Sequence, residues 1–223
     1  MIRKIIKVLL IFFPWRIRRK LLEKFYGYKI HPTARIGLSY IYPRYLEMGR
    51  GSRISHLNVA IHLDKIVLGE NSSIGRQNWI TGFPTDTNAI PFSHDLQRKS
   101  ELLVGCDSAI TQKHYIDCTN AIHIGNFVTV AGFQSQLLTH SIDIYKSRQD
   151  SYPIVIGDYS FISTNVIILG GAILPSYSVL AAGAVLVNAY NKEYMIYAGV
   201  PAKPKKEITK EAKYFSRKTG YVL

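Results

Sequence analysis

The fold is decided by residues 154–206, which read IVIGDYSFISTNVIILGGAILPSYSVLAAGAVLVNAYNKEYMIYAGVPAKPKK. Within them an aliphatic residue occupies every sixth position, here called the anchor position: Ile156, Ile162, Ile168, Leu174, Leu180 and Leu186. The fourth residue after each of the first five anchors is small or branched, as an inward-facing corner requires: Ser160, Val166, Ala172, Ser178 and Ala184. Six is a multiple of the two-residue period of a strand and not of the 3.6-residue period of a helix. The pattern therefore predicts an all-β chain, folded as a parallel β-helix of hexapeptide repeats.

Three motifs in this stretch carry a family resemblance. Residues 156–158 (IGD), 182–185 (AGAV) and 198–203 (AGVPAK) resemble the end of a hexapeptide-repeat acyltransferase, in the acetyl-CoA-dependent O-acetyltransferase branch that acts on sugars and polysaccharides. The glycine that follows Ile156 is replaced at the next four repeats, by Ser163, Leu169, Pro175 and Ala181. The resemblance implies a left-handed parallel β-helix, an exception to the usual right-handed crossover, and a homotrimer.

Composition bounds the remaining possibilities. The 223 residues, 47% of them hydrophobic, suit one domain with appendages. The formal charge of +13 is concentrated in residues 1–29, which hold nine Lys and Arg against one Glu, so the mildly basic body argues against a nucleic-acid partner. Cys106 and Cys118 are spaced too closely to meet in adjacent coils, and we expect them to stay unpaired in a reducing cytoplasm.

The chain divides into three parts: a basic N-terminal helical segment at 1–29, the β-helix at 30–190, and a C-terminal segment at 191–223. Residues 1–25 are predicted to form one or two basic amphipathic helices, whose apolar run of six residues from Val8 to Phe13 is too short to span a bilayer. Two interpretations remain open. The helix covers the open end of the β-helix, or it rests on an anionic membrane surface at the inner face of the cell membrane.

Two interruptions break the repeat. From about 81 to 101 the composition turns polar, which predicts a long loop, and Phe83, Phe92 and His94 favour a functional one. A second interruption runs from about His140 to Pro153, and the remaining repeats amount to about six to seven coils. Residues 208–216 are predicted to form a short charged helix that caps the last coil.

His140 lies where a coil breaks into the second loop, one coil before the IGD motif. The resemblance implies that it is the catalytic histidine, and imidazole titrates near neutral pH, as a general base for an alcohol must. Asp143 is predicted to hold the ring as its carboxylate partner, with a backbone carbonyl as the alternative. His114, four residues after the anchor Ile110, is predicted to be buried and structural.

The donor side rests on the resemblance, which implies that acetyl-CoA binds between neighbouring subunits. Matching the motifs places the coenzyme at Thr164, Ala182, Gly183, Lys203 and Lys206. Small residues let a ligand approach the backbone, and the lysines supply charge for its phosphates. The basic residue often found after the last coil is Asn188 here.

The sequence therefore predicts an O-acetyltransferase that moves acetyl from acetyl-CoA to a hydroxyl of a sugar, in surface-polysaccharide or lipopolysaccharide assembly. The acceptor is expected to be a small-molecule or lipid-linked sugar, and the aromatic loop and the basic N-terminus favour such a sugar over a free amino acid or a small antibiotic. N-acylation of an amino sugar, a non-catalytic scaffold and a zinc carbonic anhydrase-like enzyme are the alternatives, although the histidines lack the paired spacing of that zinc family and no metal-ligand motif is present.

Overall fold

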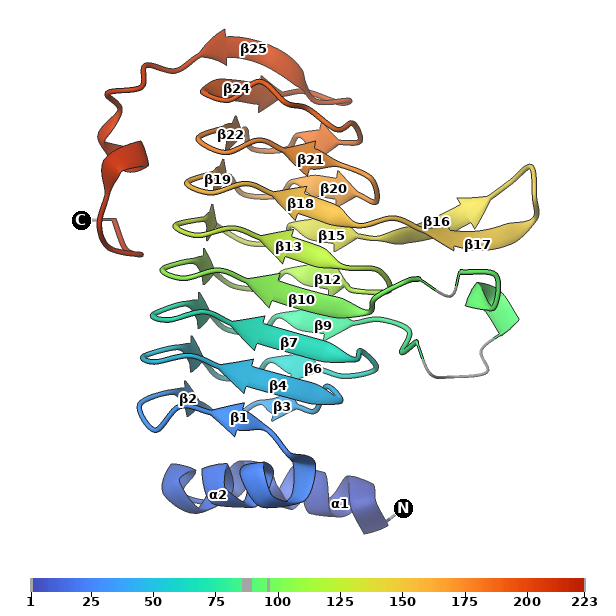
Figure 1. The fold of residues 1–223 in the computed structure, drawn as a ribbon, viewed down its shortest axis with the longest axis vertical. Coiled ribbons are helices and arrows are strands. Elements are labelled where there is room, and N and C mark those ends of the chain that lie inside the picture. The colour runs from blue at the N-terminus through green and yellow to red at the C-terminus, as the bar shows by residue number, and fades with distance from the viewer. Residues whose placement is uncertain (1, 86–89, 96, 223) are drawn as a thin grey trace.

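The computed structural model describes residues 2–85, 90–95 and 97–222, and three parallel sheets form its body (Figure 1). The first sheet contains β1 Lys29–Ile30, β4 Tyr45–Met48, β7 Lys65–Leu68, β10 Glu101–Val104, β13 Ile122–Ile124, β18 Ile154–Ile156 and β21 Ile173–Leu174. The second contains β2 Arg35–Ile36, β5 Arg53–Ile54, β8 Ser73–Ile74, β11 Ala109–Ile110, β14 Thr129–Val130, β19 Phe161–Ile162, β22 Val179–Leu180, β24 Met195–Ala198 and β25 Lys203–Glu207. The third contains β3 Tyr40–Ile41, β6 Val59–Ala60, β9 Trp79–Thr81, β12 Tyr115–Asp117, β15 Gln136–Leu138, β20 Ile167–Leu169 and β23 Val185–Leu186.

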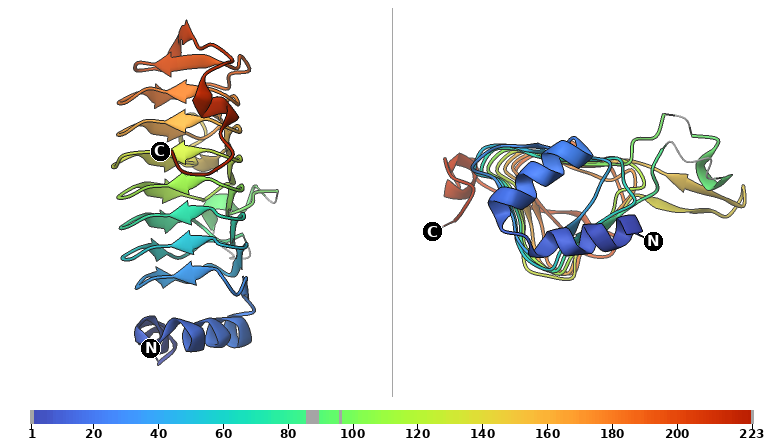
Figure 2. Two further views of the ribbon diagram at one scale, coloured as in Figure 1. Left: turned by 90° about the vertical axis from the view of Figure 1, so that its left-hand side faces the viewer. Right: turned by 90° about the horizontal axis from the view of Figure 1, so that it is seen from below.

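From β1 to β23 the strands of these three sheets follow one another in turn, so each set of three makes one coil (Figure 2). The first and third sheets each have seven strands, which sets the number of coils at seven. Parallel pairing stacks equivalent residues directly above one another, as with Ile54, Ile74 and Ile110 in the second sheet. The predicted parallel β-coil of hexapeptide repeats is confirmed.

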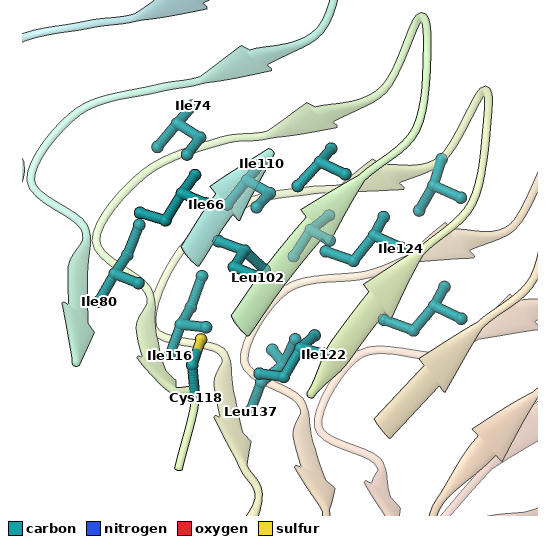
Figure 3. Packing of buried hydrophobic residues seen from close by; sticks show 14 of the residues in the cluster. Ile66, Ile74, Ile80, Leu102, Ile110, Ile116, Cys118, Ile122, Ile124 and Leu137 are labelled. Atoms are coloured by element: carbon teal, nitrogen blue, oxygen red, sulfur yellow. The ribbon is translucent and has the colours of Figure 1, made fainter. Parts of the chain in front are cut away.

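Buried aliphatic side chains fill the interior of the coil, and Figure 3 shows some of them, among them Ile74, Ile110 and Ile124. All six anchors between Ile156 and Leu186 are no more than 1% exposed, and the five corner residues between them are fully buried. Each buried Ile or Leu side chain contributes about 1.5–3 kcal/mol to stability. Stacked aliphatic side chains therefore add to the backbone hydrogen bonds that join successive coils. Cys106 and Cys118 are both free, as expected.

Both interruptions leave the coil at the same corner, where the third sheet passes to the first (Figure 2). The first runs from the end of β9 to β10 and contains the short 3-10 helix η2, Ile90–Phe92. The second is a hairpin formed by the antiparallel strands β16, His140–Asp143, and β17, Arg148–Ser151. The two insertions project side by side from the body, two coils apart.

The N-terminal residues form α1 Ile2–Leu9, the 3-10 helix η1 Leu10–Phe12 and α2 Trp15–Tyr26, which lie across the first coil (Figure 1). Leu22 of α2 is fully buried in the core cluster. Arg18 donates hydrogen bonds to the carbonyls of Gly37 and Ser39 at 2.8 and 2.7 Å, which satisfies backbone groups at the open end of the coil. Among the described helices, none is both long and apolar enough to pass through a membrane.

The predicted C-terminal helix at 208–216 is wrong in extent and in place. Only a 3-10 helix, η3 Lys213–Ser216, forms there, and it lies beside the second sheet. The last coil is covered instead by β25, which pairs antiparallel with β24. An unpaired strand edge offers a row of backbone hydrogen bonds, and pairing with it is worth more than a helix of a few turns.

Four aromatic rings stack along one corner of the coil, each at a turn that leads into a strand of the second sheet: Phe127, Tyr159, Tyr177 and Tyr194. Their consecutive centroids are 4.6, 5.3 and 4.9 Å apart with nearly parallel planes. All four residues have a φ of 55–56°, the left-handed region that non-glycine residues rarely adopt. The C-terminal segment packs against this stack, with Phe215 edge-on to Tyr177 and Tyr194.

Candidate active site

His140 lies at the base of the hairpin, at the corner from which both insertions leave the coil. Its backbone begins β16 directly after the coil strand β15, so a rigid element sets the position of the ring. The side chain is 34% exposed, which leaves one edge of the imidazole open.

The partner of His140 is Asp117, at the end of β12 in the coil below. The His140 Nδ1 atom lies 2.6 Å from Asp117 Oδ2. Asp117 is buried, and its carboxylate also accepts hydrogen bonds from Thr119 Oγ1 at 2.6 Å and from the backbone N–H groups of Thr139 and His140. With Nδ1 donating to this carboxylate, Nε2 keeps its lone pair and can accept a proton.

The electrostatics of this pair follow from its hydrogen bonds. Burial raises the pKa of Asp117, but the hydrogen bonds from His140, Thr119 and Thr139 outweigh it and hold the pKa below its usual value. The hydrogen bond to Asp117 raises the pKa of His140, against the opposing effects of burial and of the Arg98 charge. Asp117 therefore stays ionised and stabilises the protonated imidazole.

The predicted pairing of His140 with Asp143 is wrong. The Asp143 carboxylate accepts the backbone N–H groups of Tyr145 and Lys146 at 3.0 and 3.1 Å, and its Oδ2 lies 3.1 Å from Lys146 Nζ. Asp143 therefore closes the hairpin turn, and the carboxylate that contacts the His140 ring is that of Asp117. The residue missed by the sequence analysis is Asp117, whose strand pairs with β15 in register, Asp117 beside Leu138.

Two aromatic rings enclose the imidazole. Phe83 and Phe92, both from the first insertion, lie edge-on to His140 with centroids 6.1 Å from it. The buried Arg98 guanidinium sits 4.6 Å from the centre of the Phe92 ring and donates to the carbonyls of Phe83 and Thr119. Arg98 thus joins the insertion to the coil and fixes both rings around the histidine.

The two insertions are tied to each other by His94 and Asp150. His94 Nε2 lies 2.8 Å from Asp150 Oδ1, and Arg148 of the hairpin contacts the same carboxylate at 3.0 Å. His94 therefore positions the loop against the hairpin. His114, in contrast, is buried as predicted, where Ser135 N–H donates to its Nδ1 at 3.1 Å and Thr111 Oγ1 lies 3.0 Å from its Nε2. Burial lowers the pKa of His114 to about 4, so it is a neutral structural residue.

An open cleft of about 440 Å³ lies beside His140. It is lined by His62, Thr81, Gly82, Phe83, Pro84, Tyr115, Asp117 and His140. Tyr115 and its neighbour in the coil below, Trp79, are 43% and 46% exposed on the outer face of the third sheet. None of the roles predicted from the sequence falls on His62, Trp79 or Tyr115. For His62 the reason is the irregular repeat before residue 66, which hides which early residues share a corner with His140.

The predicted coenzyme residues gather at a different corner. Thr164 precedes β20, and Ala182 and Gly183 precede β23, so all three lie where the second sheet passes to the third. Gly183 N–H donates to Thr164 O at 3.1 Å, and Gly183, with a φ of +70°, has open space where a Cβ would stand. Ala182 and Gly183 are both exposed. This corner can therefore take a ligand against its backbone.

Lys203 and Lys206 belong to β25 and are exposed. Lys203 pairs with Ala198, at the end of β24 nearest this corner. Lys206 pairs with Ile196 and lies further from the corner. In one chain Thr164, Ala182 and Gly183 lie at the edge where the strands of the third sheet begin. His140 lies at the other edge, where these strands end. The structure therefore does not bring the two predicted sets together within one chain.

Two other features bear on the choice of site. A larger cavity, about 1120 Å³, lies between the second sheet and the C-terminal segment and is lined by none of the predicted site residues. In the part of the chain that the structure describes, no three His, Cys, Asp or Glu side chains are grouped to hold a metal ion. The cleft at His140 is thus the candidate active site, since it alone of these two cavities contains an acid–base pair.

Comparison with known proteins gives structural relatives only. No protein-family model matches the chain, and no curated protein matches its sequence. A solved hexapeptide transferase family protein from Anaplasma phagocytophilum is similar at 20% identity, with a TM-score of 0.50 over 85% of each chain. A Bacillus cereus structure described as a putative acetyltransferase is similar at 18% identity and a TM-score of 0.50, covering 85% of this chain and 88% of that one.

A third solved structure is a mutant of AntD, an N-acyltransferase from Bacillus cereus, in complex with dTDP and coenzyme A. It is 12% identical, with a TM-score of 0.55 over 89% of this chain and 94% of that chain. These likenesses agree with the repeat, the three-sheet coil and the terminal motifs read from the sequence. The chain has the fold of the hexapeptide-repeat acyltransferases.

Proposed function

We propose that this protein is an acetyl-CoA-dependent O-acetyltransferase that acts on a hydroxyl of a sugar, with His140 as the general base. The observation that carries the proposal is the 2.6 Å contact between His140 and the buried Asp117 in an open cleft. This arrangement suits proton transfer from an alcohol near neutral pH.

In this mechanism His140 Nε2 accepts the proton of the acceptor hydroxyl as its oxygen attacks the thioester carbonyl. The same nitrogen then returns the proton to the departing thiolate, so that an ester forms and a thiol is released. Asp117 remains ionised throughout and stabilises the imidazolium between the two steps. Phe83 and Phe92 limit the access of water to the ring, which protects the thioester from hydrolysis.

The surroundings of His140 support a sugar as acceptor. Tyr115 lines the cleft and is partly exposed, and Trp79 is its exposed neighbour on the adjacent strand, so that a flat apolar surface can take the face of a sugar ring. His62 brings ring nitrogens, and Thr81 a hydroxyl, for hydrogen bonds to its hydroxyl groups. Phe83 and Pro84 of the first insertion and His140 at the base of the hairpin form part of the cleft wall.

We infer that the donor site forms between two chains of a homotrimer. The predicted coenzyme residues Thr164, Ala182 and Gly183 lie one sheet away from His140 in the same chain. A cyclic trimer that sets this corner of one chain against the His140 corner of the next produces three equivalent sites. Lys203 and Lys206 then supply positive charge for the coenzyme phosphates, and we infer that the coil is left-handed, as in the acyltransferases whose fold it shares.

The proposal is tested by measuring thiol release from acetyl-CoA with a panel of sugar and oligosaccharide acceptors. His140→Ala is expected to lower turnover about 10²- to 10⁴-fold, the usual contribution of a general base. The matched control is His123→Ala, because His123 lies on the outer face of the first sheet and has no place in the cleft. Retention by His140→Ala of more than a few per cent of wild-type turnover contradicts the assignment.

N-acylation of an amino sugar is the second candidate, favoured by the similarity to an N-acyltransferase structure. His140 and Asp117 would remove a proton from an amine as well as from a hydroxyl. Mild alkali distinguishes the products, because it cleaves an O-acetyl ester and leaves an amide intact. A product that is stable to mild alkali would show that the enzyme is an N-acyltransferase.

A further inference from the structure

The N-terminal helices carry a group of exposed apolar side chains. Ile5, Ile6, Val8, Leu9, Phe12, Phe13, Ile17 and Phe25 are all between 46% and 72% exposed. We call these side chains and the basic residues next to them the N-terminal face. We propose that the N-terminal face docks on the surface of an anionic lipid bilayer. The proposal does not depend on the catalytic assignment.

This exposure is not explained by the role of the helices in closing the coil. That role belongs to other residues of α2, since Leu22 is buried and Arg18 holds the first coil. Trp15 Nε1 adds a hydrogen bond to Ala34 O at 3.0 Å. The buried residues of the helical segment therefore fix it to the body, and large apolar residues elsewhere on the segment remain exposed.

The position of the N-terminal face suits a flat surface. The helices lie across the end of the coil, roughly perpendicular to its long axis, and nothing else in the described chain extends beyond them at this end (Figures 1 and 2). Interfacial helices bind with their apolar side chains below the headgroups and their axes in the plane of the membrane. The face can adopt this arrangement with the coil standing upright on the bilayer.

Charge identifies the partner as an anionic surface. Arg16, Lys20 and Lys24 are exposed among the apolar residues. The single acidic residue of residues 1–29, Glu23, lies 3.6 Å from Arg19, so it does not oppose binding. Basic side chains next to exposed Phe and Ile are the combination that binds anionic headgroups. A second copy of the chain is a poor occupant, because pairing two such faces would bring together two segments with a net charge of +8 each.

Vesicle flotation with the purified full chain tests the proposal. We expect the protein to float with vesicles of phosphatidylcholine containing about 30% phosphatidylglycerol, and far less with phosphatidylcholine alone. Phe12→Ser/Phe13→Ser and Lys20→Gln/Lys24→Gln should each weaken partition about tenfold, because one removes apolar insertion and the other removes headgroup attraction. Both pairs of side chains are exposed, and an unchanged melting temperature will show that the variants fold.

The matched control is Ile144→Ser/Tyr145→Ser, which removes two apolar residues from the hairpin tip, where they are 84% and 101% exposed. This variant should float like the wild type. The proposal is overturned if the wild type does not bind anionic vesicles, or if the Phe12/Phe13 variant binds as well as the wild type. Loss of a self-associated species in the Phe12/Phe13 variant, without vesicle binding by the wild type, would identify a second copy as the occupant and also overturn it.

Discussion

His140 and Asp117 belong to neighbouring coils and are 23 residues apart in sequence. The carboxylate is fixed by Thr119, Thr139 and the His140 backbone before it meets the ring, so the pair needs no rearrangement to accept a proton. Such preorganisation is what a base on a rigid element provides over one on a loop tip.

The pH dependence of turnover should report this pair. Because the hydrogen bond to Asp117 raises the pKa of His140, kcat/KM should rise with pH and level off above a midpoint higher than the ordinary value of 6.5. Asp117→Asn should move the midpoint to lower pH and reduce the plateau about a hundredfold. The measurement is kcat/KM across pH 5–9. An unshifted midpoint in Asp117→Asn would show that Asp117 does not raise the pKa of His140.

At the scale of the element, the turns between strands leave little room for side chains. A Cβ on Gly75 would stand 1.8 Å from Thr111 O in the coil above, and that backbone oxygen cannot move without breaking the stack. Gly75→Ala should therefore lower the free energy of unfolding by about 3 kcal/mol or more. Urea unfolding measures the change.

Gly183→Ala provides the matched comparison. Its added Cβ meets nothing within 4 Å, and only the left-handed φ of +70° opposes the substitution. A cost of about 1 kcal/mol is expected for that conformation alone. If Gly75→Ala and Gly183→Ala lowered the free energy of unfolding equally, the spacing between coils would not limit the side chain at residue 75.

The elements show why the sequence predicted some features and not others. An anchor's burial depends only on the strand's own alternation, so residues 156–186 could be placed without any knowledge of their neighbours. Asp117 was missed because the anchors shift by two between Ile116 and Ile124, which hides the coil-to-coil register. The C-terminal helix was predicted wrongly because the local sequence pattern gives no information about the open edge of β24, with which β25 pairs.

The inferred trimer makes a quantitative prediction at the scale of the whole molecule. His140→Ala removes the base, and Ala182→Trp is designed to block the exposed donor corner of the same chain. If each site uses the base of one chain and the donor corner of the next, every trimer that contains both variants has one intact site of three. Since about three quarters of randomly assembled trimers contain both at equal mixing, about a quarter of wild-type activity is expected.

The experiment requires that the two inactive variants be unfolded and refolded together, with each variant refolded alone as the control. Activity no greater than that of the separate variants would place base and donor in the same chain. Light scattering of the wild type should give about three times the chain mass of 25.2 kDa.

The stacking of coils also fixes a distance. β15, which leads into His140, is the fifth strand of the third sheet, and each step between strands is about 4.8 Å, so the histidine stands roughly 19 Å above the first coil. The helical layer adds about 10 Å. If the N-terminal face rests on lipid, the acyl group is delivered nearly 30 Å above the headgroups. A sugar joined directly to its lipid carrier is then out of reach, and only a glycan long enough to climb the side of the coil can be modified.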